Sequence, residues 1–397
     1  MTSIAKIAGS STESNAGLQP FNLAHNKGQA PSKDAQAGYP MIVPRYWVND
    51  TPALPENLYT IDCATLPGGL SAVLDSPEES HKLAQRMKDL FRTHGLVLLT
   101  NNHDLHNLDR MSEVRQLLFG ESMRYSGGSN FRGKLEQNVY DTGAPREAHL
   151  HYHHEMAYVT RSTKHISFLC THALEGERAK LGATFVSENI GATQEILGTE
   201  FGKKLKDKGL CYVRKLPDLA HFQNKDLNPA IVYNFWQTSF EANDPIEAEK
   251  RAREQGLDVT WEDSETFGRY MVTKFYASAF EYCPYTDRNL LYAAIADDAL
   301  WFDTWPGVRD LPYQDRPLHL LFGDDREMTQ EEKQAFVDVY DHHGIPINWK
   351  RGDMAFICNY RFAHGRPAFE LLPGERRELG VVLGDTFERQ GALAGKW

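Results

Sequence analysis

The chain has 397 residues, with 43 basic and 54 acidic side chains and a net charge of −11. This negative balance argues against a nucleic-acid partner, because phosphate binding requires a basic surface. No hydrophobic stretch approaches the about 20 residues that span a bilayer, and the N-terminus lacks the apolar core of a signal peptide. The five cysteines are scattered and form no Cys-x2-Cys pair, so we expect a cytoplasmic protein with reduced thiols and no membrane association.

The first regular element is expected after a flexible N-terminal tail. Residues 1–40 are rich in small and polar residues and show no periodicity, which is typical of a chain segment without a packed core. Ser76 then begins a capping box with proline in the first turn, and the apolar stripe that follows predicts a helix ending near Gly95. The next four residues, 96–99, are apolar and predict a buried strand.

The middle of the chain interrupts the strand-rich regions on either side. Residues 189–316 are predicted to form a helical insertion that decorates the core. Within it, residues 241–256 and 263–280 have helical or mixed character. Because the strands before and after the insertion must pair to close the fold, we do not expect the insertion to be a separate domain.

Regular structure continues after the insertion. Thr329 begins a second capping box, which predicts a helix that ends near Tyr340. Strand character then resumes at residues 349–359. We therefore expect one domain over residues 41–397, with no internal repeat.

The most informative motif is a histidine-rich run at residues 149–155, which is followed about two hundred residues later by His364. Side chains at positions i and i+2 of a strand point the same way, so His153 and Glu155 can bind one ion together. With His364 as a third ligand, they would form the two-histidine, one-carboxylate triad of non-heme iron oxygenases. The pair alone is weak evidence, because sixteen histidines make chance pairs common.

An arginine beyond His364 strengthens this interpretation. Arg376 follows Pro373-Gly374-Glu375, which is typical of a turn that returns the chain antiparallel. A guanidinium near the metal can bind a carboxylate through two hydrogen bonds, as a cosubstrate such as 2-oxoglutarate requires.

Other ligand sets remain open at this point. Gly143, His149, His151 and Glu155 fit the first metal motif of cupins, which would give a dioxygenase without 2-oxoglutarate. The histidine run is also similar to that of dinuclear metallohydrolases, although His153 stands where those enzymes have an aspartate. A third possibility is a metal-binding protein that has kept the fold and lost turnover.

A family resemblance favours the first ligand set. Residues 152–158 resemble the His-x-Glu-Met-x-Tyr signature of the clavaminate synthase-like and SyrP-like branch of the TauD/TfdA superfamily. Further matches follow in the family's order over roughly residues 85–387. They are Tyr125-Ser126-Gly127-Gly128, Gly182-Ala183-Thr184, Phe322-Gly323-Asp324, Trp349-x2-Gly352-Asp353 and Asn359-x4-His364-Gly365-Arg366-Pro367-x-Phe369. The resemblance implies an α+β fold with a mainly β core, a double-stranded β-helix (jelly roll) with flanking helices and a helical insertion.

The resemblance also implies roles for individual residues. Fe(II) would be bound by His153, Glu155 and His364, and the distal carboxylate of 2-oxoglutarate by Arg376 with help from Thr184. The adjacent Arg377 is the alternative for the same role, and we prefer Arg376. Candidate substrate contacts, which flank the metal motif, are Arg132, Tyr140 and Tyr158.

The implied function is a dioxygenase that uses Fe(II), 2-oxoglutarate and O2 on a small molecule, an amino acid or a metabolite derived from one. Family halogenases have a small residue in place of the carboxylate, so Glu155 favours hydroxylation, desaturation or cyclisation. The sequence leaves the oligomeric state open, with a homodimer as one option.

Overall fold

The computed structural model describes the greater part of the chain. The described residues are 18–20, 41–43, 58–120, 122, 134–136, 139–140, 146, 149–222, 234–264, 268–294 and 316–397. Most of the predicted tail at residues 1–40 lies outside this part. Within the tail, only the strand β1 (Leu18–Pro20) is described, and it pairs in parallel with β2 (Met41–Val43).

A seven-stranded sheet forms one half of the core. In spatial order its strands are β3 (Thr60–Asp62), β4 (Leu96–Thr100), β17 (Met354–Cys358), β8 (Arg161–His172), β19 (Glu378–Glu388), β6 (Val139–Tyr140) and β5 (Lys134–Glu136). Only the β3–β4 pair is parallel. Residues 354–358 of β17 are all buried, as expected for a strand in the interior of a covered sheet.

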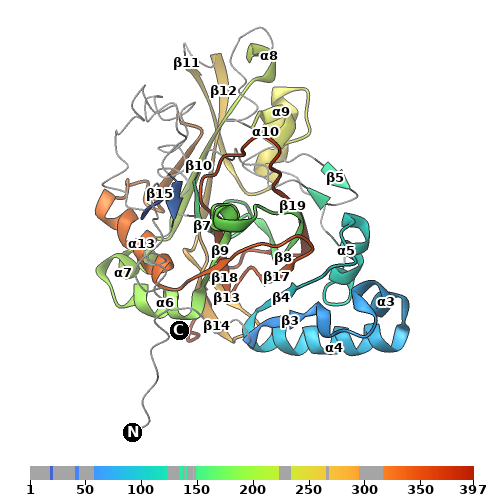
Figure 1. Ribbon diagram of the computed structural model, residues 1–397. Coiled ribbons are helices and arrows are strands. Elements are labelled where there is room, and N and C mark those ends of the chain that lie inside the picture. The colour runs from blue at the N-terminus through green and yellow to red at the C-terminus, as the bar shows by residue number, and fades with distance from the viewer. Residues whose placement is uncertain are drawn as a thin grey trace.

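A four-stranded antiparallel sheet forms the other half. Its order is β16 (Gly344–Ile347), β9 (Thr184–Glu188), β18 (Phe362–Arg366) and β7 (Leu150–His153). The helix α13 (Gln330–His342) packs against β7, β9 and the helix α6 (Asn189–Leu197), and α6 is followed by α7 (Glu200–Lys208). These three helices gather on one side of the molecule (Figure 1).

The opposite side carries the helices from the start of the described chain. They are α3 (Gly69–Asp75), α4 (Pro77–His94) and α5 (Leu108–Gln116) (Figure 1). The prediction for α4 is confirmed: the Ser76 side chain accepts a hydrogen bond from the Glu79 N–H, and Gly95 ends the helix with a φ of 72°. The inner face of α4 packs on β4 and β17, where Leu83 and Met87 are buried.

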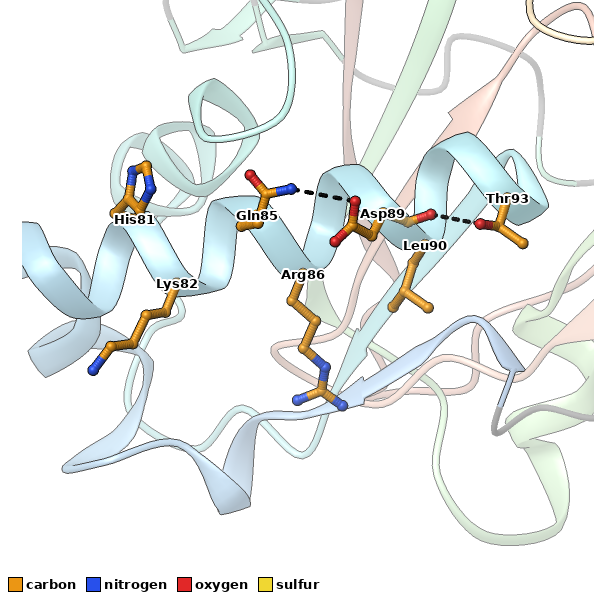
Figure 2. A pocket seen from close by; sticks show the side chains of 7 residues that line it. All are labelled: His81, Lys82, Gln85, Arg86, Asp89, Leu90 and Thr93. Carbon is orange, nitrogen blue, oxygen red and sulfur yellow. Dashed lines mark hydrogen bonds between the residues drawn. The ribbon is translucent and has the colours of Figure 1, made fainter.

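The outer face of α4 is polar (Figure 2). On it, Gln85 donates to Asp89 at 3.2 Å, and the Thr93 hydroxyl donates to the Asp89 carbonyl at 2.9 Å. An open surface depression of 560 Å³ runs along this face. None of the residues that line it belongs to a metal-binding group of the described chain.

The insertion is only partly helical, and the prediction for residues 263–280 is wrong in this respect. The strands β11 (Asp258–Ser264), β12 (Gly268–Ala277), β10 (Leu210–Pro217) and β15 (Leu318–Phe322) form a four-stranded sheet in that order. A hairpin of β13 (Phe280–Cys283) and β14 (Arg288–Leu291) follows. Residues 268–277 are rich in β-branched and aromatic side chains, which favour a strand over a helix.

Besides α6 and α7, the described helices of the insertion are α8 (Leu219–Phe222), α9 (Trp236–Ser239) and α10 (Pro245–Glu254). The helical prediction for 241–256 is confirmed in its centre by α10. The predicted helix after Thr329 is also confirmed, as α13, and both hydrogen bonds of its capping box are present. Among the described residues, no helix has the length and apolar character needed to cross a membrane.

Candidate metal centre

The pairing of β18 with β7 brings the two halves of the motif together. His364 pairs directly with His153 in the antiparallel register, and their ring centroids are 4.3 Å apart. His364 Nε2 lies 3.6 Å from Glu155 Oε2. Each of the three side chains offers one ligand atom, and these atoms all lie within 4.8 Å of one another. Residues remote in the sequence therefore form one possible metal centre.

Glu155 reaches this position from a turn and not from a strand, contrary to our expectation. β7 ends at His153, and Met156 has a φ of 58°, which is a strained value for a non-glycine residue. Asn359 holds the turn: its Oδ1 accepts the Glu155 N–H at 2.9 Å and its Nδ2 donates to the Glu155 carbonyl at 3.0 Å. The hydroxyl of Ser162 donates to the same carbonyl at 2.9 Å. The backbone of the carboxylate residue is thus fixed from several sides.

The ring of His153 is oriented by a backbone hydrogen bond. Its Nδ1 lies 2.8 Å from the His151 carbonyl oxygen, which can only accept, so Nδ1 must carry the proton. In the neutral ring the lone pair is then on Nε2. This is the usual arrangement of metal-binding histidines, in which the second ring nitrogen donates to a carbonyl or a carboxylate.

A small cavity between the two core sheets contains this group. The four-stranded sheet and the turn after β7 contribute Leu150, His153, Glu155, Thr184, His364, Gly365 and Arg366 to its lining. The larger sheet contributes Phe168 and Val381, and Arg377 comes from the residue just before β19. Phe168 and Val381 are cross-strand partners on β8 and β19. The free volume is 40 Å³. A single water needs roughly 10–15 Å³ by this kind of measure, so a larger ligand requires outward movement of the lining side chains.

The alternative cupin set, His149, His151 and Glu155, is not assembled. Between the pairs His364↔His153 and Arg366↔Leu150 the register shifts by one residue, which is a β-bulge in β7. Leu150 therefore lines the cavity together with His153, whereas His149 and His151 pack on Phe185. Phe185 is the neighbour of the cavity residue Thr184 on β9, so its side chain occupies the other face of the sheet.

His154 also faces away from the candidate centre. Its Nε2 lies 3.0 Å from the side-chain amide of Asn189, and its Nδ1 lies 3.2 Å from both the carbonyl oxygen and the backbone nitrogen of Ala293. Burial lowers the pKa of His154 to about 3, so the ring is neutral at physiological pH. This histidine joins the turn after β7 to α6 and to the segment after β14.

The structure does not support our preference for Arg376 over Arg377. Arg376 is 62% exposed and pairs with Glu378 at 3.1 Å, whereas Arg377 lines the cavity. Arg376 and Glu378 are two residues apart in extended chain and share a face, so the residue between them points the other way. Arg377 Nε donates to the Gly182 carbonyl at 2.7 Å, and the guanidinium lies 4.8 Å from the centre of the Phe369 ring. The candidate anion-binding group is therefore Arg377.

The comparisons with known proteins decide the family. The family model described as taurine catabolism dioxygenase TauD, TfdA family, matches residues 64–383. The chain belongs to the TauD/TfdA family. Members of this family are non-heme dioxygenases that depend on Fe(II) and 2-oxoglutarate, so membership confirms the cofactors expected from the sequence.

Individual relatives of the family are distant. A clavaminate synthase-like protein of Arabidopsis thaliana is 21% identical over 286 residues, which are 72% of this chain and 81% of that protein. PvcB, an Fe, alpha-ketoglutarate dependent oxygenase, aligns over 80% of this chain and 84% of its own, with 16% identity and a TM-score of 0.42. A putative taurine dioxygenase of Burkholderia xenovorans aligns over 78% and 82%, with 13% identity and a TM-score of 0.42. At these TM-scores the solved structures add no argument to the family assignment.

Of the family-derived substrate contacts, the two that the structure describes do not line the cavity. Tyr140 on β6 and Tyr158 after β7 are both buried, and neither is among the residues that line it. The Arg214 guanidinium lies 5.9 Å from the centre of the Tyr158 ring. Arg132 lies outside the described residues.

Three residues acquire a place at the centre that our sequence predictions did not give them. Trp349 Nε1 donates to the Thr184 hydroxyl oxygen at 2.9 Å and so orients its O–H. Arg366 lines the cavity beside His364, and the ring of Phe369 packs against the guanidinium of Arg377. Trp349, Arg366 and Phe369 all lie in family motifs, which was the available signal. The directions in which their side chains point depend on the fold and could not be predicted from the motifs.

Proposed function

We propose that the chain oxidises an unactivated C–H bond of a small molecule, with His153, Glu155 and His364 as the iron ligands and Arg377 and Thr184 as the 2-oxoglutarate site. The observation that carries this proposal is that one cavity between the core sheets is lined by all five residues. All five were named from the sequence, four of them as the preferred residues and Arg377 as the alternative to its neighbour Arg376.

The donor set fits iron(II). Two imidazoles and one carboxylate on one side of an ion are the usual ligands of non-heme iron oxygenases and leave positions open for other molecules. The carboxylate of Glu155 is 2% exposed and His364 is 7% exposed, so little water competes for these ligand atoms. When bound, iron(II) and 2-oxoglutarate supply the activation of dioxygen that C–H oxidation requires.

The protein's own residues orient the proposed metal ligands and shield the open metal positions from water. The His151 carbonyl holds His153 in the tautomer with a free Nε2, and Asn359 fixes the Glu155 peptide. Phe168 and Val381 form an apolar wall that limits water near the open metal positions. These groups are in place before any ligand binds, which reduces the entropy lost on binding.

Arg377 supplies the positive charge that a diacid needs. A guanidinium can bind a carboxylate through two parallel hydrogen bonds, and the contacts with Gly182 and Phe369 keep this one directed into the cavity. The Thr184 hydroxyl, whose oxygen already accepts from Trp349, is left to donate its proton. Both groups suit the distal carboxylate of 2-oxoglutarate.

The fold proposed for this function is a double-stranded β-helix, with the four- and seven-stranded sheets as its two halves. Its support is that strands from both sheets line the one cavity and that β7 pairs with β18 across about two hundred residues. The insertion interrupts the chain between these two strands, so we propose one domain and not two.

For the substrate we propose an amino acid or a metabolite derived from one. This rests on the resemblance to the clavaminate synthase-like branch and on the Arabidopsis thaliana relative of that name. An intact carboxylate at Glu155 favours hydroxylation, desaturation or cyclisation.

The test is succinate formation by the Fe(II)-loaded protein with 2-oxoglutarate, O2 and a panel of amino acids. At least one amino acid should stimulate succinate release, and His153→Ala, Glu155→Ala and His364→Ala should each abolish it. Persistent release by all three variants would refute the ligand assignment. If the wild-type protein binds Fe(II) and 2-oxoglutarate and releases no succinate with any compound, the enzymatic role would be refuted for this substrate class.

A further inference from the structure

A second group of metal-binding side chains lies at the surface, away from the cavity. Glu195 is on α6, and His342 and His343 are at the C-terminal end of α13, which packs against α6 (Figure 1). Glu195 Oε2 lies 3.0 Å from His342 Nδ1 and 2.8 Å from His343 Nε2. Both imidazoles thus converge on one carboxylate oxygen, and the three ligand atoms lie within 4.8 Å of one another.

The spacing of these atoms is close to that around a tetrahedral zinc ion. With Zn–N and Zn–O bonds of about 2.0–2.2 Å, two ligand atoms of a tetrahedral ion are roughly 3.3 Å apart. The hydrogen-bonded distances of 2.8 and 3.0 Å would need to lengthen by only a few tenths of an ångström. The side chains of Glu195, His342 and His343 are 38%, 50% and 25% exposed, so a cation can enter from solvent and a water can complete its shell.

The frame around the three ligands is already fixed. The Glu188 N–H donates to the His343 carbonyl at 3.1 Å, and the His343 ring lies so close to Gly191 that an added Cβ would be 2.6 Å from its Cε1. Glu188 Oε2 accepts from the Gly191 N–H at 2.8 Å. Its other oxygen, Oε1, is buried without a hydrogen-bond partner among the described residues. A buried carboxylate oxygen of this kind adds negative potential beside the imidazoles, which favours a cation.

We propose that Glu195, His342 and His343 form a second metal site, which binds Zn(II) and ties α6 to α13. Two imidazoles with one carboxylate and an open fourth position form a zinc-binding set, and imidazole favours late first-row metals over Mg(II) or Ca(II). Bound zinc stabilises the folded state, because the unfolded chain does not hold the three ligands together. The site is independent of the proposed enzymatic function, since it shares no residue with the cavity.

The test is the number of Zn(II) ions bound by metal-free, tag-free protein in competition with a chromophoric chelator. A His153→Ala/His364→Ala variant, which lacks the cavity ligands, should bind one equivalent, and added zinc should raise its melting temperature. Adding His342→Ala and His343→Ala should remove both effects. The wild-type protein should bind two equivalents, and the His342→Ala/His343→Ala variant alone should bind one.

Two single variants complete the design. Glu195→Gln keeps the size of the side chain and removes its charge, so the zinc affinity of the second site should fall at least tenfold. His81→Ala removes an exposed histidine from α4 and should change neither stoichiometry nor affinity. The proposal is overturned if the His153→Ala/His364→Ala variant binds no zinc, or if the four-residue variant binds as much zinc as it does. If the His153→Ala/His364→Ala variant binds no zinc, the wild-type protein would bind one equivalent, through its cavity ligands alone.

Discussion

Arg376 and Arg377 are chemically identical neighbours, and the geometry separates their roles. The first pairs with Glu378 in solvent, and the second enters the cavity beside Thr184. An exposed ion pair contributes little to stability, whereas a guanidinium held in a confined cavity can bind a carboxylate strongly. The sequence predicted an arginine at this point in the chain and could not determine which one, because a one-residue shift at the preceding turn reverses the faces of the strand.

Replacing Arg377 should therefore weaken cosubstrate binding selectively. Loss of one partner from a buried charge pair costs about 2–5 kcal/mol, so Arg377→Met should raise the dissociation constant for 2-oxoglutarate by a factor of about 30 or more. Arg376→Met should change it less than about threefold, as expected for an exposed pair. Isothermal titration of the anaerobic Mn(II)-loaded variants measures both constants. A larger effect at Arg376 would restore the assignment made from the sequence.

The protonation of His165 on β8 should make the stability of the folded protein depend on pH. It stacks on Phe119 with ring centroids 4.1 Å apart, and its Nε2 lies 2.8 Å from the Tyr285 hydroxyl. Burial lowers the pKa of His165 to about 4, although Asp385 acts in the opposite direction. The unfolded chain therefore binds a proton between pH 6.5 and 4 that the folded chain does not, and the contribution of His165 to stability is lost as the pH falls through this range.

The His165→Phe variant isolates this contribution. Between pH 7.5 and 5.5 the wild-type free energy of unfolding should fall by about 1.4 kcal/mol more than that of the variant. Urea unfolding at the two pH values measures the difference, and the ring stack on Phe119 is preserved in the variant. Parallel pH profiles for the two proteins would show that His165 is protonated in the folded state as readily as in the unfolded one.

At the scale of elements, the positions of the proposed metal ligands depend on how β7 ends. The bulge in β7 turns His149 and His151 away, and the strained turn at Met156 places Glu155 beside His153. Local sequence rules predicted α4 and α13, because their caps and apolar stripes are local signals. They could not predict a bulge or a turn held by Asn359, because that residue lies 204 positions from Glu155 in the chain. The same limit explains the misassigned β12, whose strand conformation depends on pairing with β10 and β11.

Asn359→Ala tests the link between β17 and this turn. Removing the side chain leaves buried groups of the Glu155 peptide unsatisfied, at a cost of about 1–3 kcal/mol, and should weaken metal binding by about 10- to 100-fold. Metal titration and urea unfolding of the same variant separate the two effects.

A matched control exists in Asn289. This buried asparagine also accepts a backbone N–H and donates to a backbone carbonyl, both of Leu393, and does not line the cavity. Asn289→Ala should lose comparable stability and keep its metal affinity. Equal losses of metal affinity in both variants would mean that Asn359 acts only through global stability.

At the scale of the whole molecule, two sheets formed by distant parts of the chain enclose the candidate centre, and helices cover them on two sides (Figure 1). Family resemblance predicted an α+β fold with a sheet-rich core and brought the three candidate metal ligands to attention, because the motifs are ordered along the chain. It did not predict the sheet of β11, β12, β10 and β15, although the family motif Phe322-Gly323-Asp324 begins at the last residue of β15. The strands of the insertion are therefore the described elements that the sequence predicted least well.

The claim on which the account depends is that His153, Glu155 and His364 hold iron(II) within reach of Arg377. The most direct measurement is the visible charge-transfer absorption that appears when a keto acid chelates protein-bound Fe(II) under anaerobic conditions. The band should appear in the wild-type protein and in Arg376→Met, require much higher 2-oxoglutarate in Arg377→Met, and be absent from His153→Ala and His364→Ala. An unchanged band in His153→Ala and His364→Ala would contradict the account.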